Sequence, residues 1–446
     1  NIKLSTKKVY SGNMCFLNNV SHLIKGTGFG YKEKYEFSKL RLHEVGLGSK
    51  MRIALEPIIP SNLPLLITGL DYLINAMSGL SLKVESTGEI NLLGRGELHL
   101  DTALNHLRNV YIKHEIRLSE PGCIFAETGI MPSQLLSKSS SFNNKNNIEF
   151  MAEHMENSFS DSYHSLKSLR TESIAIFDQY RDLNQYPEEN ALRNRLERDF
   201  KWDKLSIKNL WSFGPLSDNP CVLINESFGT RFDQPSLRDS RENVIQAFRS
   251  ATQNGPLCEE PVRQLIYKMT NISISNNPMD VISGQIFEMS KKAIHTSLLL
   301  STPRIMEPYY EAEILSNKEG LQTVYDLLSR RRAHLILERG VPGTTFFEIV
   351  AKVPILDSFG FETDLRLQTM GQASVLMSYC GYEVVPGDPL DKDVKTEVLE
   401  PAEPVALARD IMVKTRRRKG LSDDISIVKH FDELTMLEAI KMNYNK

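Results

Sequence analysis

The feature that most constrains the fold is an order of short strands and helices that occurs twice along the chain. In the first copy, apolar and alternating runs predict strands at 51–57, 80–85, 89–94 and 114–118. Leucines at helical spacing predict one helix after Ser61, a candidate N-cap, and another across 100–111. The order strand–helix–strand–strand–helix–strand is that of a ferredoxin-like domain.

The same order returns after Pro308. Strands are predicted at 310–315, 333–338, 346–353 and 373–379. A helical stripe begins at Leu321, and Asp357 and Ser358 can cap a second helix that carries Phe361 and Leu365. Two copies of one plan, far apart in the chain, predict an α+β multidomain fold in which two similar domains flank a larger one.

The interval between the copies and the two chain ends complete this organisation, since 446 residues exceed one compact core. The elements predicted for the interval are a polar, exposed loop at 137–147, helices at 188–200, 236–251 and 285–300, and a strand at 263–274. Up to residue 48, short strands with turns suggest the end of a β-barrel. A Pro-rich stretch at 400–404 precedes a helix predicted at 405–414.

Composition excludes several classes of protein. The hydrophobic fraction is 41% and the charged fraction 24%, and no apolar run approaches the roughly 18 residues of a membrane span, so no membrane partner is expected. The five cysteines are scattered without a CxxC pair, which favours a reducing compartment and argues against a zinc ribbon. His99, His106 and His114 lie near one predicted helix, but their spacing does not suit a metal site.

No nucleotide-binding or catalytic motif is evident. A P-loop needs glycines followed by Lys and then Ser or Thr, and the nearest match, 46–50, lacks that spacing. The stretch 317–320 just misses a guanine-reading NKxD. Adjacent acids such as Glu259 and Glu260 point in different directions and do not form a catalytic pair. No catalytic residue, metal ligand or cofactor-binding residue is therefore expected in this chain.

A series of motifs carries a family resemblance. In chain order they are IALEPIIPSNLP, GRGELHLD, LWSFGP, GPLCEEPVR, SGQI, TPRIMEPYY, DSFGFETDLR, MGQA, VPGDP and TRRRKGLS. This series resembles the domains that follow the GTPase domain in the eukaryotic translocating elongation factor and its relatives. The resemblance extends over nearly the whole chain from about Met51 onward.

Two regions distinguish the subfamily. The translocating factor carries a modified His in an HRGGGQ loop at the tip of its arm domain, and the matching stretch here is Asp280, Val281, Ile282, Ser283, Gly284 and Gln285. An Asp in place of that His argues against ribosomal translocation. The motifs TPRIMEPYY and GDPLDK and the long ending instead resemble the spliceosomal GTPases of the U5 small nuclear ribonucleoprotein. The U5-type proteins often keep GGGQ in the tip loop, so this chain is a divergent member.

The resemblance implies a domain plan and a function. The implied domains are 1–48 as the end of a domain II β-barrel, 49–122 as ferredoxin-like domain III, 123–306 as an S5-like arm domain IV, 307–384 as ferredoxin-like domain V, and 385–446 as an extension returning to domain IV. The chain would be the C-terminal regulatory and scaffolding half of a U5 GTPase, coupling nucleotide state to RNA unwinding in pre-mRNA splicing. The alternative is the corresponding half of a translation elongation factor.

The same resemblance implies partners and a location. GTP and Mg²⁺ would belong to a GTPase domain that is missing from this chain, and that domain would be a partner in its own right. The other implied partners are the large U5 scaffold protein, U5 RNA and other spliceosomal proteins, and the implied location is the nucleus. A free-standing RNA-binding module is a weaker interpretation, because no aromatic platform of the RNP kind is present.

Three places are candidate contact sites. The run Arg416, Arg417, Arg418 and Lys419 follows the helix predicted at 405–414, so its side chains are expected to project toward a partner or RNA; a solvated turn is the equally weighted alternative. For Arg330, Arg331 and Arg332, cations at a helix terminus are the favoured interpretation and partner contact the minority one. Arg95, on a tight turn, is a minority candidate for interdomain contact.

Overall fold

The computed structural model describes residues 28–30, 37–39, 50–155, 209–214, 221–227, 235–392, 394 and 402–425, apart from 78, 86 and 276. The chain divides into two compact units, Asn1–Gly122 and Cys123–Lys446. Of the predicted barrel segment, strands β1 (Gly28–Gly30) and β2 (Phe37–Lys39) are described, and they pair antiparallel. The helix predicted at 188–200 lies outside the described residues.

The first unit contains two helices and most of a five-stranded sheet, whose fifth strand, β7 (Gly122–Cys123), pairs with β3 (Met51–Pro57). Its elements are β3 (Met51–Pro57), α1 (Leu63–Ala76), β4 (Ser81–Val84), β5 (Ile90–Gly94), α2 (Glu97–His106), a π-helical continuation over Leu107–Ile112, and β6 (Ile116–Leu118). The strand order is β4-β5-β3-β6. Leu66, Leu70 and Leu73 fall on one face of α1 and are buried, as their helical spacing predicts. Asn62, and not Ser61, occupies the N-cap position of α1, without a side-chain capping bond.

Helix α1 packs closely against the π-helical segment because it carries a glycine at the contact. A Cβ atom placed on Gly69 would lie 2.6 Å from Cγ1 of Ile112 and 3.6 Å from Cδ1 of Leu107. Both neighbours are buried. The absence of a side chain at this position therefore sets the distance between the two helical segments.

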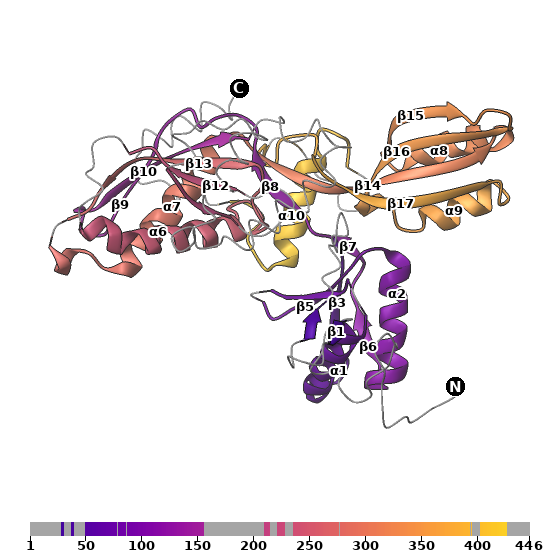
Figure 1. Ribbon diagram of the computed structural model, residues 1–446, viewed down its shortest axis with the longest axis horizontal. Helices are drawn as coiled ribbons and strands as arrows, with labels where there is room; N and C mark the ends of the chain where they lie inside the picture. The colour runs from indigo at the N-terminus through magenta and orange to yellow at the C-terminus, as the bar shows by residue number, and fades with distance from the viewer. Residues whose placement is uncertain are drawn as a thin grey trace. The chain divides into compact units, whose positions relative to one another are not determined.

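The second unit begins with a five-stranded sheet, here called the β13 sheet. Its strands are β9 (Ser137–Ser140), β10 (Asn147–His154), β11 (Leu210–Phe213), β12 (Val222–Asn225) and β13 (Leu265–Ser273), in the order β11-β12-β13-β10-β9. The pair β12 and β13 is parallel and the other pairs are antiparallel. Helices α6 (Pro235–Gln253) and α7 (Ser283–Leu300) lie along one face (Figure 1).

The exposed loop predicted at 137–147 is wrong over its first part. Residues 137–140 form strand β9, and the side chains of Ser137 and Ser139 are buried. The Ser137 hydroxyl lies 2.8 Å from the Ala293 carbonyl and 3.0 Å from that of Phe150. A short hydroxyl can enter a core when backbone carbonyls accept its hydrogen bond, so a Ser-rich composition does not by itself indicate a loop.

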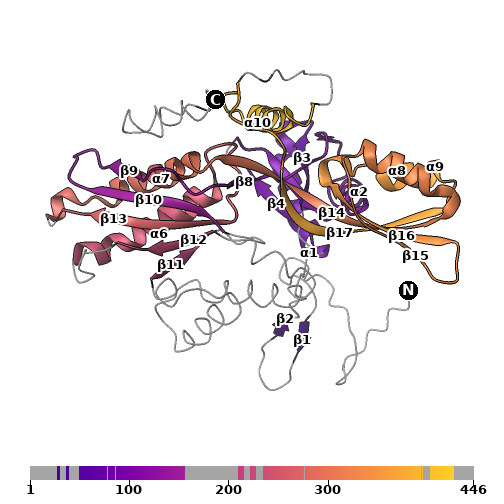
Figure 2. The same cartoon turned by 90° about the horizontal axis from the view of Figure 1, so that it is seen from above.

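A second sheet, the β14 sheet, follows. Its elements are β14 (Pro303–Asn317), α8 (Leu321–Arg330), β15 (His334–Gly340), β16 (Phe346–Pro354), α9 (Phe361–Gln368) and β17 (Ala373–Val384). The strand order is β15-β16-β14-β17, with antiparallel neighbours. Helices α8 and α9 lie on one face of this sheet (Figure 2). Asp357 and Ser358 do not cap α9, because Gly360 in the left-handed region occupies the N-cap position.

Strand β14 is much longer than the strand predicted at 310–315 and pairs with three strands: β17 along one side, and two others in succession along the other side. Its beginning, from Pro303 to Met306, pairs with β8 (Ala126–Gly129), and its later part, from Tyr309 onward, pairs with β16. Pro308 falls in the gap between these pairings, where that side of the strand has no ladder partner in the described residues. Proline in the sequence therefore marks a change of partner within one strand.

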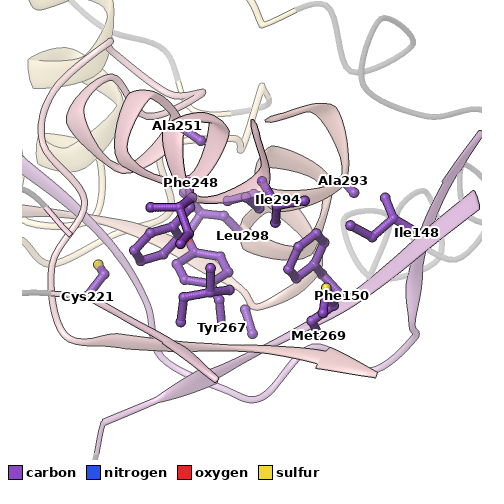
Figure 3. Close-up of a cluster of buried hydrophobic side chains, with 14 of the residues drawn as sticks. Ile148, Phe150, Cys221, Phe248, Ala251, Tyr267, Met269, Ala293, Ile294 and Leu298 are labelled. Carbon is purple, nitrogen blue, oxygen red and sulfur yellow. The ribbon is translucent and has the colours of Figure 1, made fainter. Parts of the chain in front are cut away.

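Each sheet of the second unit has its own apolar core. Under the β13 sheet, Phe248 and Leu298 from the helices meet Phe150, Tyr267 and Met269 from the strands (Figure 3). Under the β14 sheet, the core residues include Ile314, Val324, Ile349, Phe361 and Leu365. The fold is thus α+β with several antiparallel sheets. Among the described residues, no helix combines the length and apolar character needed to cross a bilayer.

Candidate functional site

The basic run at 416–419 lies within and just after a helix, α10 (Leu407–Arg418), which extends beyond the predicted 405–414. The helix buries Leu407, Ala408, Ile411 and Met412 at helical spacing. The last turn therefore presents the four cations in different directions around the helix axis, some toward the protein and some toward solvent.

Two of the four cations face inward. Arg416 is 7% exposed, and its guanidinium donates to the Leu257 carbonyl and, at 2.6 Å, to the Ser422 carbonyl. The Lys419 ammonium lies 2.8 Å from a carboxylate oxygen of Glu260 and donates to the carbonyls of Cys258 and Glu259, both at 2.8 Å. The expectation that the whole run projects outward is wrong for Arg416 and Lys419.

The acceptors of these cations belong to a turn, 255–260, that is organised around a second buried acid. The Glu127 carboxylate accepts from the backbone N–H groups of Leu257 at 2.9 Å, Cys258 at 2.7 Å and Glu260 at 3.2 Å. Gly255 permits this approach, since a Cβ there would lie 2.2 Å from Glu127 Oε2. Burial raises the pKa of Glu127 to about 7, although the three N–H donors oppose that shift.

Glu127, Glu260, Arg416 and Lys419 together form what we call the tail clamp. It joins three segments that are remote in sequence: strand β8, the 255–260 turn and helix α10. Its charged side chains are paired with acids or hydrogen-bonded to backbone groups, as buried charges require. The clamp attaches the C-terminal helix to the 255–260 turn.

The other two cations of the run face solvent. Arg417 donates in a bidentate manner to Asp423, at 2.8 and 2.7 Å, and the pair is about half exposed. This partner lowers the pKa of Asp423 below its ordinary value. Arg418 is exposed on the same turn. A partner or RNA contact at 416–419 is therefore a prediction for Arg417 and Arg418.

Two of the arginines at 330–332 connect the end of α8 to the segment 357–364 and to β14. Arg331 donates to the carbonyls of Asp357 and Phe359, at 3.1 and 3.0 Å, and pairs with Asp364 at 2.5 Å. Arg332 adopts a positive φ of 51° and forms ion pairs with buried Glu307 at 3.0 Å and with Asp357 at 2.5 Å.

These bonds fasten the segment before α9 and agree with the favoured helix-terminus interpretation. Arg330, at the end of α8, is exposed.

Arg95 lies against its own unit. Its guanidinium covers Gly79, where a Cβ would approach Arg95 Nε to 2.3 Å, and Gly79 has a φ of +83°. Burial, together with the charge of Arg95, lowers the pKa of His99. An interdomain contact through Arg95 remains a prediction.

The tip loop, Asp280 to Gln285, starts at the end of a short 3₁₀ segment and enters helix α7 at Ser283. Asp280 is held by Lys145, whose ammonium lies 2.9 Å from the carboxylate. This bond lowers the pKa of Asp280. Gly284 has open space around it and lies within the first turn of α7. The structure thus places Asp280 in an ion pair with the β9–β10 turn.

The tail clamp was not predicted from the sequence. No motif marks Glu127 as a buried acid, and residues 257 and 416 are too far apart in the chain to give a local signal. The GPLCEEPVR motif did contain the turn, with a glycine at 255 and an acid at 260. Among the described residues, no group of three or more His, Cys, Asp and Glu side chains could hold a metal ion.

Comparison with known proteins gives a consistent set of relatives. Residues 304–393 match the family model "Elongation factor G C-terminus". The chain is 34% identical over 388 residues, 87% of its length, to the 110 kDa U5 small nuclear ribonucleoprotein component CLO of Arabidopsis thaliana. It is 35% identical over 394 residues, or 88% of its length, to the pre-mRNA-splicing factor cwf10 of Schizosaccharomyces pombe.

A third relative is the pre-mRNA-splicing factor SNU114 of Saccharomyces cerevisiae, which is 32% identical over 433 residues and 93% of this chain. The chain spans 38%, 38% and 42% of these three proteins. The similarity therefore extends over most of this chain and over about two-fifths of each relative.

Proposed function

We infer that the chain is a divergent member of the family of U5 small nuclear ribonucleoprotein components, and we propose that it supplies the regulatory and scaffolding part of such a protein in pre-mRNA splicing. The observation that carries the proposal is the similarity to splicing proteins over 87–93% of the chain. Because the chain spans only about two-fifths of those relatives, the activity and partners of the whole protein are part of the proposal.

The proposed domain plan follows the elongation-factor arrangement. The sheets of β3–β6 and of β14–β17 share one strand order, in which the first strand lies between the third and the fourth. This order supports a ferredoxin-like assignment for both, as domains III and V. The β13 sheet with α6 and α7 would be the S5-like arm, domain IV, and α10 would belong to an extension that returns to it.

GTP and Mg²⁺ would be held by a GTPase domain in the part of the relatives that this chain does not span. The chain itself does not suit the nucleotide, since its sequence contains no Gly-Lys dipeptide of the kind that ends a P-loop. Its role would be to present surfaces to the large U5 scaffold protein and to U5 RNA in the nucleus. Nucleotide state can bias RNA unwinding only if these partners bind the two states with different affinities.

The alternative function is ribosomal translocation, as the corresponding part of a translation elongation factor. Two observations count against it. The splicing proteins described above are similar to the chain over most of its length. The position expected to carry a modified His holds Asp280, whose carboxylate is engaged by Lys145.

Affinity purification tests the proposal. The full-length protein, tagged in its own cells, should co-purify with U5 RNA and with a large protein of the U5 particle. Sedimentation mainly with translating ribosomes would favour the elongation-factor alternative. If the protein purified with neither the U5 particle nor ribosomes, the proposal would be contradicted.

A further inference from the structure

Two loops meet at one end of the β13 sheet, and we call them the arm tip. One is the turn 141–146 between β9 and β10, and the other consists of residues 275 and 277–282 in the connection between β13 and α7. Asp280 joins them. Its carbonyl accepts from the side-chain amides of Asn143 at 3.1 Å and Asn146 at 3.0 Å, and its carboxylate pairs with Lys145.

Asn146 adds further hydrogen bonds to the contact between the two loops. Asn146 is fully buried, and its side-chain oxygen accepts from the Ser275 N–H at 2.9 Å. Its backbone N–H donates to the Ser141 hydroxyl at 3.1 Å. The two loops are therefore fixed to each other by side-chain and backbone hydrogen bonds as well as by an ion pair.

This polar frame carries large apolar side chains that face solvent. Phe142 is 99% exposed, Met279 is 91% exposed and Ile282 is 53% exposed. Phe142 and Met279 directly precede Asn143 and Asp280, which share a hydrogen bond. Because the loops that carry these apolar side chains are already fixed to each other, binding through them does not require the loops to be ordered, which is a property of an interface anchor.

The small number of charged residues at the arm tip favours a protein partner over RNA. Within 139–148 and 274–287 the only charged residues are Lys145 and Asp280, and they neutralise each other at 2.9 Å. The other polar residues there are Ser, Asn and Gln. A site for single-stranded RNA combines aromatic side chains with a positive groove, and this surface has no excess positive charge.

We propose that the arm tip is a protein-docking surface, in which Phe142 and Met279 insert into an apolar pocket of a partner protein whose rim is uncharged and polar. This proposal goes beyond the proposed function, because it assigns a role in protein binding to one surface of the chain. It rests on the proposed function only in that the U5 particle is the material used in the test. RNA and a second copy of this chain are the competing occupants.

Hydroxyl-radical footprinting of the full-length protein, free and in the purified particle, tests the surface. Met370 is 90% exposed on the β14 sheet domain and serves as the matched methionine. We expect Met279 and Phe142 to be oxidised readily in the free protein and to be protected by roughly ten-fold or more in the particle, with protection that survives ribonuclease. Recovery of U5 RNA with the particle reports separately on the proposed function.

The other outcomes each overturn the proposal. Unchanged oxidation of Met279 in a particle that contains U5 RNA would mean that the tip is not an interface there. Protection that disappears with ribonuclease would assign the tip to RNA. Protection of the free protein that increases with its concentration would assign it to self-association.

Substitution adds an independent test. The double variant Phe142→Ser with Met279→Ser should keep the melting temperature, since both side chains are exposed, and should weaken retention of the docked protein in the particle by roughly thirty-fold. Leu367→Ser with Met370→Ser, at 72% and 90% exposure, is the control pair. Equal losses in both double variants, or none in the first, would contradict a specific docking site.

Discussion

At the residue scale, the four cations at 416–419 have two separate roles. Arg416 and Lys419 enter the tail clamp, whereas Arg417 and Arg418 remain on the surface. The sequence could predict the cluster of charge but not this division, because the acceptors lie on the turn 255–260. Likewise, the interpretation of 330–332 as cations at a helix terminus could be predicted from their position at the end of a helix. The burial of the Glu127 carboxylate could not be predicted from the sequence.

The division predicts opposite results for substitutions within one run. Arg417→Gln with Arg418→Gln should leave the melting temperature nearly unchanged, since exposed pairs contribute on the order of 0–1 kcal/mol. It should weaken association with the U5 particle, most visibly at low salt, and make binding less dependent on salt, because each lost phosphate contact removes a salt-dependent contribution. Binding of the tagged protein to the particle across a salt series measures this.

Lys419→Met is the matched substitution on the inward side. It leaves the buried Glu260 carboxylate unpaired and should lower the free energy of unfolding by about 3–5 kcal/mol, as measured by urea denaturation. A double Arg variant that unfolds at much lower temperature, or a Lys419 variant of unchanged stability, would show that the assignment of roles is reversed.

Glu127 predicts a pH dependence of stability. Its pKa is about 7 in the folded protein against an ordinary 4.5, so the folded state holds the proton more tightly. The stabilisation is complete below about pH 4.5 and is lost as the pH rises through about 7, amounting to about 3 kcal/mol. Glu127→Gln should remove this slope from urea denaturation measured at a series of pH values. Parallel pH curves for the two proteins would rule out the shift.

At the element scale, periodicity was a reliable guide where one face of a helix is buried. Helices α6 and α7 occur close to the predicted 236–251 and 285–300, because their apolar stripes cover the β13 sheet. Predictions failed where local composition misled: β9 is Ser-rich but buried, and β14 continues through Pro308 because its partners change along its length. Such partners come from tertiary structure and leave no local signal.

Gly69 provides a prediction about element packing. Gly69→Ala places a methyl group 2.6 Å from Ile112 Cγ1, and overpacking of this kind costs about 1–3 kcal/mol. That cost outweighs the gain of about 1 kcal/mol in helix propensity, so the first unit should be destabilised. Hydrogen exchange of the α1 amides measures the effect. Thr68→Ala, on the exposed side of the same helix, is the control and should not weaken protection; similar loss in both variants would exclude close packing as the cause.

At the scale of the whole molecule, the resemblance to translocase-type proteins was predictable from motifs spread along the chain, and the three relatives described above are named as a U5 component and as splicing factors. The attachment of α10 to the 255–260 turn could not be derived from periodicity, since it rests on bonds between residues such as Lys419 and Glu260 that only the folded chain brings together.

The absence of a P-loop in the sequence predicts that this chain alone neither binds nor hydrolyses GTP. Isothermal titration with GTP and Mg²⁺ should give no binding heat, whereas the full-length protein should bind the nucleotide. The full-length protein is the positive control for the titration. Micromolar affinity of the isolated chain for GTP would refute the prediction.

Strand β14 has a consequence for how sequences of this kind can diverge. Because the strand pairs with β8 at its beginning and with β16 and β17 beyond it, inserting or deleting one residue would turn every later side chain to the opposite face of the sheet. The loop after β15, from Val341 to Thr345, bears no such constraint. Between distant lineages, gaps should therefore accumulate in that loop and be absent from 303–317, so that the length of this strand is inherited more strictly than its residues.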